Sequence, residues 1–560
     1  MKKLITLQIQ QRLLVIIGYS AFVFLLILPF KVLASPLPDV IRTGGPSKPH
    51  EAKIAVLVSQ NVYAGKPFTV TNEKGDTVFS GTLKEANNPI PWNYAATADF
   101  SSLTTPGRYT LQSQKLRSEP WVIDENAGND LIPILLGLFH ANRDGYEPSF
   151  QHKPAHLHDA TVKGGRYDNK KFDLTGGWMD AGDQRHFTDT AAYAAIMLQI
   201  AAKLDLTHAD ELNNEADVGI RWLLKTHPLP DLFIGQIGDW RDSERGFRDP
   251  AEDDQSALPG IGYRFAYPSG LSGMMGKVAA ALALAAERNT GKERANLLAQ
   301  AQQWYQQGKE NHSDEQLPGH YYDNLTWHDD MSLAAVMLWR VTGNDQYQRD
   351  AYTYLDDDND YHYTFSNPSI GLLSAADLCG TTGHEATTDI KVRELACGIL
   401  RTAAQEVIST ATMENAPWGT PGRMTWGQLG DNGGHGAIIA LAKRVNLISD
   451  AAVAVRARDW LLGLNPWGNS FIVGYGVNPP TTPYHWASVF GESLPKGAVV
   501  GGPASITELT KVKVTVPKKG QFDSDRAIYC KKADYYVTSE PSLVYNANSI
   551  LLIASLKSLK

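Results

Sequence analysis

The sequence predicts a mainly α-helical protein in which paired helices form an (α/α) toroid, preceded by a small all-β sandwich. Short alternating runs fill the chain between residues 54 and 123, and long apolar stretches at helical spacing follow residue 124. Long loops rich in Gly, Pro and aromatic residues separate those stretches. With 560 residues, 43% of them hydrophobic, the chain has material for more than one domain and a large core.

The first structural segment, residues 38–124, is predicted as the sandwich. It contains the runs IAVLV, FTVT, DTVFSG, RYTL and PWVI, with turn signals such as Pro106-Gly107 between them. Strands of this length with turns at this spacing are typical of a small β-sandwich.

The second segment, residues 125–560, is predicted as the toroid. Eleven helices are expected, at 130–142, 188–204, 214–226, 273–288, 292–307, 329–342, 346–355, 389–408, 433–446, 449–463 and 543–557. Several are apolar on more than one face, which indicates packing on both sides. The loops at 143–187, 227–272, 310–328, 411–432 and 464–542 are long enough to be functional and are expected to build a cleft.

The N-terminus reads as an export signal. Lys2, Lys3 and Arg12 precede an apolar run at 13–30, and small residues follow up to Ala34. We expect a signal peptide at 1–34 and a secreted or periplasmic protein. The alternative is an uncleaved N-terminal anchor, because the apolar run is about as long as a short membrane span.

Charge and cysteine content exclude some classes of function. The net charge of −8, with no long basic run, argues against nucleic acid, whereas 13 Trp and 23 Tyr suit sugar faces. Three cysteines are too few for a disulfide framework. Cys379 and Cys397 either form one bridge or stay as two buried thiols.

The loop from Gly176 to His186 carries the first candidate chemistry. It reads GGWMDAGDQRH, so small residues surround Asp180 and Asp183 and allow a tight turn that points both carboxylates into one cavity. Two carboxylates in one site repel each other, which raises one pKa while the other stays ionised. The alternative is an ordinary turn or a cation-binding loop.

The second candidate is Glu540, which lies just before the last predicted helix, with Pro541 in a first-turn position. Its alternative role is to favour the helix N-terminus electrostatically.

With both motifs considered, the chain resembles glycoside hydrolase family 9, the inverting cellulase-type family, in the branch with an N-terminal immunoglobulin-like module. The resemblance rests on ordered motifs, namely Ala98-Asp-Phe-Ser, Pro106-Gly-Arg-Tyr, the Gly176 loop, Trp327-His-Asp-Asp, Leu464-Asn-Pro-Trp-Gly-Asn-Ser, Val500-Gly-Gly-Pro, Tyr536-Val-Thr-Ser-Glu and Tyr545-Asn-Ala. It implies an (α/α)6 toroid and an immunoglobulin-like sandwich.

The resemblance also implies roles for single residues. Asp183 matches the general base, Asp180 the partner that helps hold the attacking water, and Glu540 the general acid. In an inverting enzyme the acid and the base are about 6.5 to 9.5 Å apart, so that a water fits between them. Tyr545 matches a tyrosine near the cleaved sugar.

Aromatic and histidine side chains in the loops are the candidates for sugar binding. The substrate-binding set is Trp178, His156, Trp327, Trp426, His485, Trp486 and Tyr545, and Trp240, Tyr321 and Tyr322 are further aromatic candidates. Trp426 and Trp486 are favoured because Gly-rich or Pro-rich sequence flanks them. The alternative for each is ordinary packing.

Some positions depart from the family pattern. Where the family usually reads Pro-His-His-Arg, this chain reads Pro483-Tyr-His-Trp486, which replaces a guanidinium by an indole. Ser539 stands where Asn is usual. Ser539 keeps a hydrogen-bonding group there, whereas the altered subsite at residues 483–486 argues against internal cleavage of crystalline cellulose.

No metal and no cofactor are expected. Relatives often hold zinc through two Cys and two His, but residues 140–160 contain no cysteine. His152, His156 and His158 are therefore expected to form a hydrogen-bonded cluster that lines the cleft, with a zinc site as the alternative. Many relatives also hold calcium, yet here Lys277 occupies the acidic position opposite Asp329-Asp330. Its ammonium either neutralises these acids or is an ordinary solvated helix residue.

The function expected from this resemblance is inverting hydrolysis of β-1,4-glucosidic bonds in cellulose-type glucans or cello-oligosaccharides, with soluble or short chains favoured. One alternative is an exo-acting β-glucosidase or exo-β-glucosaminidase on short oligosaccharides. The other is a catalytically idle carbohydrate-binding protein on the same scaffold. Retention of all three acids favours an enzyme.

Overall fold

The computed structural model describes residues 37–149, 151–311, 317, 321–322, 326–357, 365–383, 387–490 and 494–559. The predicted signal segment at 1–34 lies outside these residues. Within the described ranges, no helix combines the length and the hydropathy that a membrane span requires.

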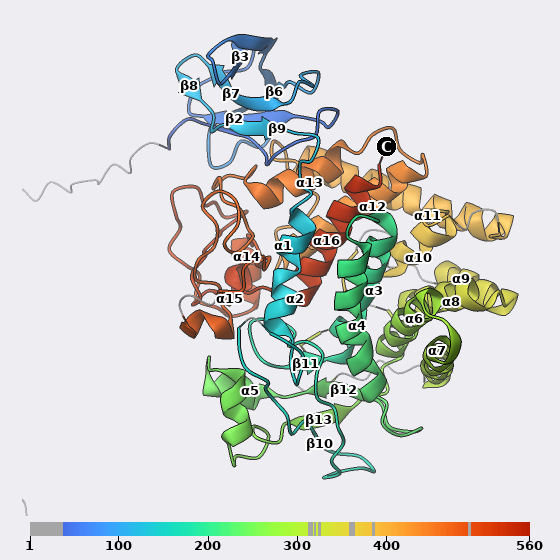
Figure 1. Cartoon of the computed structure of the whole chain (residues 1–560). Helices are drawn as coiled ribbons and strands as arrows, with labels where there is room; N and C mark the ends of the chain where they lie inside the picture. Colours follow the sequence, from blue (N-terminus) through green and yellow to red (C-terminus); the bar gives the residue numbers. More distant parts are fainter. Residues whose placement is uncertain are drawn as a thin grey trace, which may run out of the picture. The chain divides into compact units, whose positions relative to one another are not determined.

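The N-terminal part is a sandwich of two antiparallel sheets, coloured blue in Figure 1. One sheet has the order β1-β2-β6-β5 and the other β4-β3-β7-β8, with β9 also paired to β7. Phe68, Val70, Leu111 and Trp121 are buried between them. The strands are β1 Val40–Arg42, β2 Ile54–Ser59, β3 Pro67–Asn72, β4 Thr77–Thr82, β5 Lys84–Ala86, β6 Tyr94–Asp99, β7 Gly107–Ser113, β8 Leu116–Arg117 and β9 Trp121–Ile123.

Within the described ranges, six helices form a closed inner ring, which confirms the predicted toroid. Each packs on the next, from α3 through α6, α8, α10 and α12 to α16, and α16 packs back on α3 (Figure 1). Their side chains are buried almost all round, as expected for helices packed on both sides. The inner helices are α3 Thr188–Leu204, α6 Ser272–Arg288, α8 His328–Thr342, α10 Gly371–Leu378, α12 Gln428–Arg444 and α16 Leu543–Lys557.

An outer helix accompanies each inner one. The pairs are α3 with α4, α6 with α7, α8 with α9, α10 with α11 and α12 with α13, while α1 and α2 both contact α16. The outer helices are α1 Leu131–Leu135, α2 Gly137–Asn142, α4 Ala209–Lys225, α7 Gly291–Asn311, α9 Asp345–Asp357, α11 Ile390–Ser409 and α13 Ala452–Leu462.

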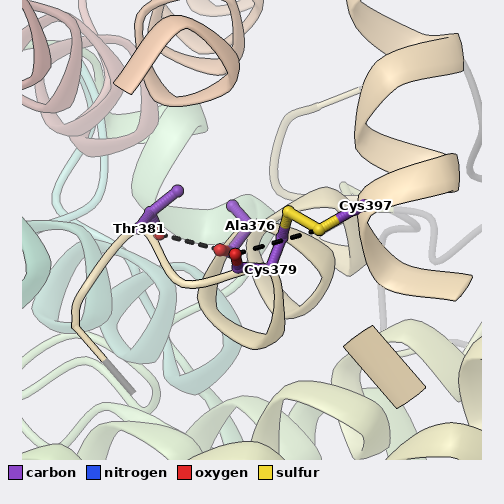
Figure 2. Close-up of a disulfide and its surroundings, with 4 residues drawn as sticks. All are labelled: Ala376, Cys379, Thr381 and Cys397. Carbon is purple, nitrogen blue, oxygen red and sulfur yellow. Dashed lines mark hydrogen bonds between the residues drawn. A yellow bond between two sulfur atoms is a disulfide. The ribbon is translucent and has the colours of Figure 1, made fainter. Parts of the chain in front are cut away.

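The ring helices differ from the prediction in their existence or continuity in two places, and α4 and α12 each begin five residues earlier than predicted. The predicted helix 130–142 is divided into α1 and α2, and the inner helix α10 was not predicted. Only eight residues long, α10 begins at Gly371 and spans two turns, which is too short for a periodic pattern to stand out. Cys379, just after α10, forms a disulfide with Cys397 of α11, so the bridged alternative is correct (Figure 2).

The long loops carry short elements of their own. A four-stranded sheet with the order β10-β13-β12-β11 is formed by β10 Thr161–Val162, β11 His186–Phe187, β12 Ile234–Ile237 and β13 Phe265–Pro268. The other short elements are α5 Trp240–Arg245, η1 Pro250–Gln255, the π-helical turn η3 Thr410–Glu414, η4 Trp486–Phe490, α14 Ile506–Lys511 and α15 Tyr536–Ser539.

Candidate active site

The loop from Gly176 to His186 ends in β11 and leads into the inner helix α3. Gly177 has φ +76°, and a Cβ there would lie 2.6 Å from the Trp222 ring. At Gly182 a Cβ would lie only 2.0 Å from the backbone oxygen of Tyr484. Glycine is therefore required at both positions, the first for its left-handed conformation and the second for close approach of backbones.

Backbone hydrogen bonds join this loop to segments far along the chain. The Trp486 N–H donates to Gly182 O at 2.8 Å, and the Leu543 N–H donates to Asp180 O at 3.0 Å. The Gly182 N–H in turn donates to Glu540 Oε1 at 3.3 Å. The two acidic motifs, predicted from opposite ends of the toroid sequence, thus meet in one pocket.

Asp183 is held by a guanidinium from its own loop. Arg185 Nε donates to Asp183 Oδ2 at 2.6 Å, Nη2 donates to the same oxygen, and the Arg185 N–H donates to Oδ1 at 3.2 Å. Asp183 is 9% exposed and Arg185 is 8% exposed. Asp183 thus lies in the pocket with a fixed cationic partner on its Oδ2.

Asp180 lies in a different environment. Thr190 Oγ1 donates to its Oδ1 at 2.5 Å, and the Tyr322 hydroxyl donates to its Oδ2. Burial, assisted by the charge of Asp183, raises the pKa of Asp180 to about 7, although these two hydrogen bonds act in the opposite direction. Asp180 therefore changes charge close to neutral pH.

Glu540 is the third carboxyl of the pocket. Burial, followed by the charge of Asp183, raises the pKa of Glu540 well above its usual range. The side chain thus keeps its proton at neutral pH, as a general acid requires. Glu540 follows α15 and lies three residues before α16, whose N-cap is Ser542.

The three carboxyls line a pocket of about 560 Å³ with aromatic walls. Tyr484 contacts Tyr536, with ring centroids 5.7 Å apart, and Tyr536 contacts Trp426 at 5.4 Å. The Trp426 side chain is 43% exposed, so it offers an open face. The lining comprises Asp180, Ala181, Asp183, Arg185, Phe187, Ser243, Tyr321, Tyr322, Trp426, Tyr484, Tyr536, Glu540, Ser542 and Tyr545.

Comparison with known proteins identifies this arrangement. The family model described as glycosyl hydrolase family 9 matches residues 130–553, which is most of the chain. The chain belongs to glycosyl hydrolase family 9. A second family model, described as the cellulase N-terminal Ig-like domain, matches residues 48–118 within the sandwich. The protein is therefore a cellulase-type glycoside hydrolase with an N-terminal immunoglobulin-like module.

Relatives and solved structures agree with this assignment. Endoglucanase 14 of Arabidopsis thaliana is 25% identical over 449 residues, which is 72% of this chain and 83% of the relative. A metagenome-derived family 9 endoglucanase has a similar fold, with a TM-score of 0.78 and 23% identity over 93% of this chain and 99% of that one. A mutant of the thermostable endoglucanase of Alicyclobacillus acidocaldarius gives a TM-score of 0.76 at 23% identity, covering 93% and 100%.

Two of the residues proposed for sugar binding in this family 9 protein are in the core. Trp178 is 1% exposed, contacts Phe139 and donates its indole N–H to Glu215 at 2.8 Å. His156 is 2% exposed and bonds to Asp144 at 2.7 Å. The predictions that they contact sugar are wrong for this structure, because neither side chain lines the pocket.

His485 and Trp486 are both fully buried. His485 Nε2 lies 2.9 Å from Asn142 Oδ1, and Trp486 packs against Met179 and Ala487. Trp486 reaches only the wall of a side cavity of about 220 Å³ and has no exposed face for stacking, so the prediction of a stacking platform is wrong. Half-buried Trp327 packs on His328 with centroids 4.0 Å apart and does not line the central pocket.

Trp426 and Tyr545 do lie in the pocket wall, as do Tyr321 and Tyr322. Their contacts with sugar stay predictions. Sequence reasoning missed Arg185 and Thr190, although both lie in or just after the singled-out loop. A basic residue two positions after a candidate base is the signal that could have identified Arg185.

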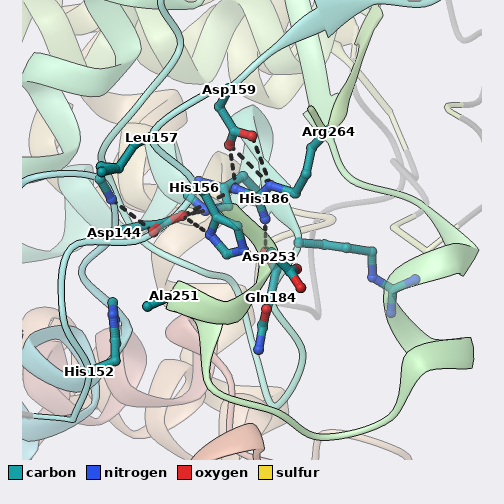
Figure 3. A network of polar contacts seen from close by, with 12 residues as sticks. Asp144, His152, His156, Leu157, Asp159, Gln184, His186, Ala251, Asp253 and Arg264 are labelled. Carbon is teal, nitrogen blue, oxygen red and sulfur yellow. Dashed lines mark hydrogen bonds and ion pairs between the residues drawn. The ribbon is translucent and has the colours of Figure 1, made fainter. Parts of the chain in front are cut away.

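A buried charge network contacts the loop from Gly176 to His186 (Figure 3). Asp144 Oδ2 lies 2.7 Å from His156 Nδ1 and 2.8 Å from His186 Nε2, and Arg264 Nη2 donates to it at 3.1 Å. Arg264 also donates to Asp159 and to the backbone oxygen of Gln184. Because Gln184 stands between Asp183 and Arg185, the network fixes the backbone that carries both.

Asp144, His156 and His186 bring three possible metal-ligand atoms within 4.8 Å of one another. Metal binding needs a neutral imidazole. Burial and Arg264 lower the pKa of His156, but Asp144 and Asp253 outweigh them and raise it to about 9, so His156 is protonated. The Arg264 cation also bonds to Asp144. The residues present do not fit a zinc site.

Lys277 of α6 is fully buried at the junction of three inner helices. Its Nζ lies 2.9 Å from Asp189 Oδ1 of α3 and 3.2 Å from Asp330 Oδ1 of α8. Asp329 instead accepts a hydrogen bond from the Ile370 N–H at 2.6 Å. Of the two alternatives for Lys277, charge neutralisation is correct, and the solvated helix residue is wrong.

Proposed function

We propose that this family 9 protein hydrolyses β-1,4-glucosidic bonds in soluble cellulose-type glucans or cello-oligosaccharides with inversion at the anomeric carbon. The observation that carries the proposal is the contrast between Asp183, paired with a cation, and Glu540, kept protonated by burial. An inverting glycosidase needs one ionised and one protonated carboxyl.

In the proposed reaction Asp183 takes a proton from the attacking water and Asp180 helps to orient that water. The water oxygen bonds to the anomeric carbon while the bond to the leaving oxygen breaks. The proton of Glu540 passes to that leaving oxygen. The products are one sugar with a new reducing end and one with a new hydroxyl at its non-reducing end. Proton exchange with solvent then returns both carboxyls to their starting states.

Asp180 is the second candidate for the base. Its pKa of about 7 suits proton abstraction near neutral pH, whereas the Oδ2 of Asp183 already accepts hydrogen bonds from Arg185. In either assignment one of the two aspartates activates the water and the other holds it.

The pocket favours a neutral sugar over an amino sugar. Among its described lining residues the only carboxyls are Asp180, Asp183 and Glu540, all engaged in the proposed chemistry. An exo-β-glucosaminidase would need a further acid to pair with the substrate ammonium. The endoglucanase names of relatives point the same way.

We also propose that residues 1–34 direct export to the periplasm or outside the cell, and that 38–124 and 125–560 are the sandwich and toroid domains. The basic residues ahead of an apolar run support the first proposal. The positions of β9 and α1 on either side of residue 124 support the second.

The decisive experiment is hydrolysis of cello-oligosaccharides of three to six units, with chitosan oligomers as the comparison. Proton NMR of the first product should show the α-anomer, and a β-anomer would contradict inversion. Mixed product lengths would indicate internal cleavage, and release of a single short product would indicate exo action. Preference for chitosan oligomers would support the glucosaminidase instead.

A further inference from the structure

Arg185 is a cation inside a pocket whose other charged lining residues are acids. Two of its three guanidinium nitrogens, Nε and Nη2, bond to Asp183. The third, Nη1, is buried and has no hydrogen-bond partner among the described residues. A buried donor left unpaired is costly, so its presence needs an explanation, and a ligand that brings an acceptor supplies one.

The guanidinium is fixed in this position from three sides. Tyr321 covers its face, with the guanidinium carbon 3.9 Å from the ring centroid. Gly238, at φ +82°, leaves room for the stem, since a Cβ there would lie 3.2 Å from Arg185 Cγ. The preceding residue, Gln184, is anchored by its N–H to Asp242 at 3.0 Å and by its backbone oxygen to Arg264.

We propose that Arg185 is a specificity-determining residue that donates from Nη1 to an oxygen of the sugar bound beside Asp183, while its other two nitrogens hold that carboxylate. This inference rests on the proposed function and deepens it. The sugar at this position must present an acceptor, either a hydroxyl or a ring oxygen.

The same contact selects against amino sugars. A protonated amine has only donors, as does the guanidinium, so an ammonium in contact with Nη1 leaves two donors facing each other and two positive charges close together. The pocket therefore binds a sugar with a hydroxyl at this position in preference to one with an ammonium, as in glucosamine. Selectivity of this kind is large where a buried polar group would otherwise stay unpaired.

The test measures binding separately from turnover. Calorimetry on Glu540→Gln, and on the same protein with Arg185→Lys or Arg185→Met added, follows binding of cellotetraose and of the glucosamine tetramer at pH 6. We expect Arg185→Lys to weaken cellotetraose binding about 10-fold and Arg185→Met about 100-fold, because a charge-assisted hydrogen bond is lost. Preference for cellotetraose should fall at least 10-fold in Arg185→Met.

Arg340→Lys is the matched control, since Arg340 is also buried and paired with two carboxylates, Asp377 and Glu287, but does not line the pocket. It should change cellotetraose binding less than 2-fold. Kinetics with Glu540 intact should show that Arg185→Lys lowers kcat/KM for cellotetraose more than for the glucosamine tetramer, a change in sugar preference that a merely structural role would not produce.

The outcomes separate the two proposals. If the wild-type protein cleaves no glucan but Arg185→Lys still weakens binding, the proposed function fails and the role of Arg185 stands. If cellotetraose binding and sugar preference are unchanged in the Arg185 variants, the role of Arg185 is wrong, whatever the wild type cleaves. Absence of cellotetraose binding to Glu540→Gln together with absence of cleavage by the wild type overturns both. Should Arg185→Met fail to fold, Arg185→Lys decides.

Discussion

At the scale of single residues, three carboxyls with the same intrinsic chemistry are held in three electrostatic states. Asp183 is paired with Arg185, the pKa of Asp180 is raised to about 7, and burial raises the pKa of Glu540 well above its usual range. When neighbouring groups shift the pKa values of two carboxyls in different directions, one pocket can supply both an acid and a base at the same pH.

Asp183→Asn should lower kcat on cello-oligosaccharides by about 10²–10⁴, because the amide cannot accept the proton of the attacking water. The measurement is the initial rate of product release, with the melting temperature checked for both proteins. Asp231→Asn serves as the control, since Asp231 forms an ion pair with Arg166 in which both side chains are exposed. A variant of Asp183 that keeps most of its activity would transfer the role of base to Asp180.

Glu540→Gln should raise the melting temperature at neutral pH. The folded protein holds a proton on Glu540 that the unfolded chain releases above a pKa of about 4.3, so the stability of the wild type falls as pH rises beyond that value. Glutamine has no proton to lose, so the gain should shrink toward zero near pH 4.

Differential scanning fluorimetry between pH 4 and pH 8 measures this dependence. Glu85→Gln, on the exposed face of β5, is the control. A constant difference between Glu540→Gln and wild type over the whole range would show that Glu540 is ionised in the folded protein.

Individual site residues could be predicted from the sequence only where neighbouring residues restrict the local backbone. The acids could be located because glycines and a small residue around Asp180 and Asp183 mark a tight turn, and because Glu540 precedes a helix. Trp178 and Trp486 could not be placed, since the face that a tryptophan shows is set by packing partners remote in the sequence, such as Phe139 and Met179.

At the scale of elements, the helices could be predicted wherever an apolar run was long. The runs of α3 and α6 are buried on every side, and both were located to within a residue at each end. By contrast α12 begins at Gln428, ahead of the expected residue 433. Its start was missed because its first two turns, with Gly430, Gly433 and Gly434, have a loop-like composition. Gly433 instead allows close approach to the α16 backbone at Asn548.

The inner ring is joined by charge as well as by apolar packing. The Lys277 ammonium of α6 bridges Asp189 of α3 and Asp330 of α8 at full burial. Burial lowers the pKa of Lys277, but the charges of Asp189 and Asp330 outweigh that effect and raise it. Three helices that carry parts of the toroid wall thus depend on one cation.

Lys277→Met should destabilise the protein by about 3–5 kcal/mol, because it leaves Asp189 and Asp330 buried without their partner. Thermal unfolding measures the loss, and adding Asp330→Asn to the variant should restore part of it. Lys203→Met is the matched control, because Lys203 pairs with Glu287 and each side chain is 28% exposed. Such exposed ion pairs contribute at most about 1 kcal/mol to the free energy of unfolding.

The wild-type melting temperature should also be indifferent to EDTA, since an ammonium fills the position between the acids. A fall in melting temperature with chelator, reversed by calcium, would show that a metal contributes to stability elsewhere in the chain.

At the scale of the whole described chain, the sandwich and the toroid share partly buried polar contacts. Arg458 of α13 is 3% exposed at its side chain and pairs with Glu51 at 2.7 Å, and Arg456 donates to Ile54 O at 3.1 Å. Trp92 of the sandwich segment stacks on Phe522 with centroids 5.5 Å apart. Nothing in the local sequence pairs Glu51 with Arg458, because 407 positions separate them.

Glu51→Gln should therefore lower the melting temperature of the entire chain without changing cleavage of cello-oligosaccharides. Arg458 would keep Asp459 as a partner at 3.0 Å, so we expect a loss of about 1–3 kcal/mol rather than the full cost of an unpaired buried charge. Scanning calorimetry should show one shifted transition, because the contacts tie the two parts together. Glu73→Gln, on an exposed turn of the sandwich, should leave the transition in place. Two separate transitions in the wild type, neither moved by Glu51→Gln, would show that the sandwich and the toroid unfold independently and that this ion pair does not join them.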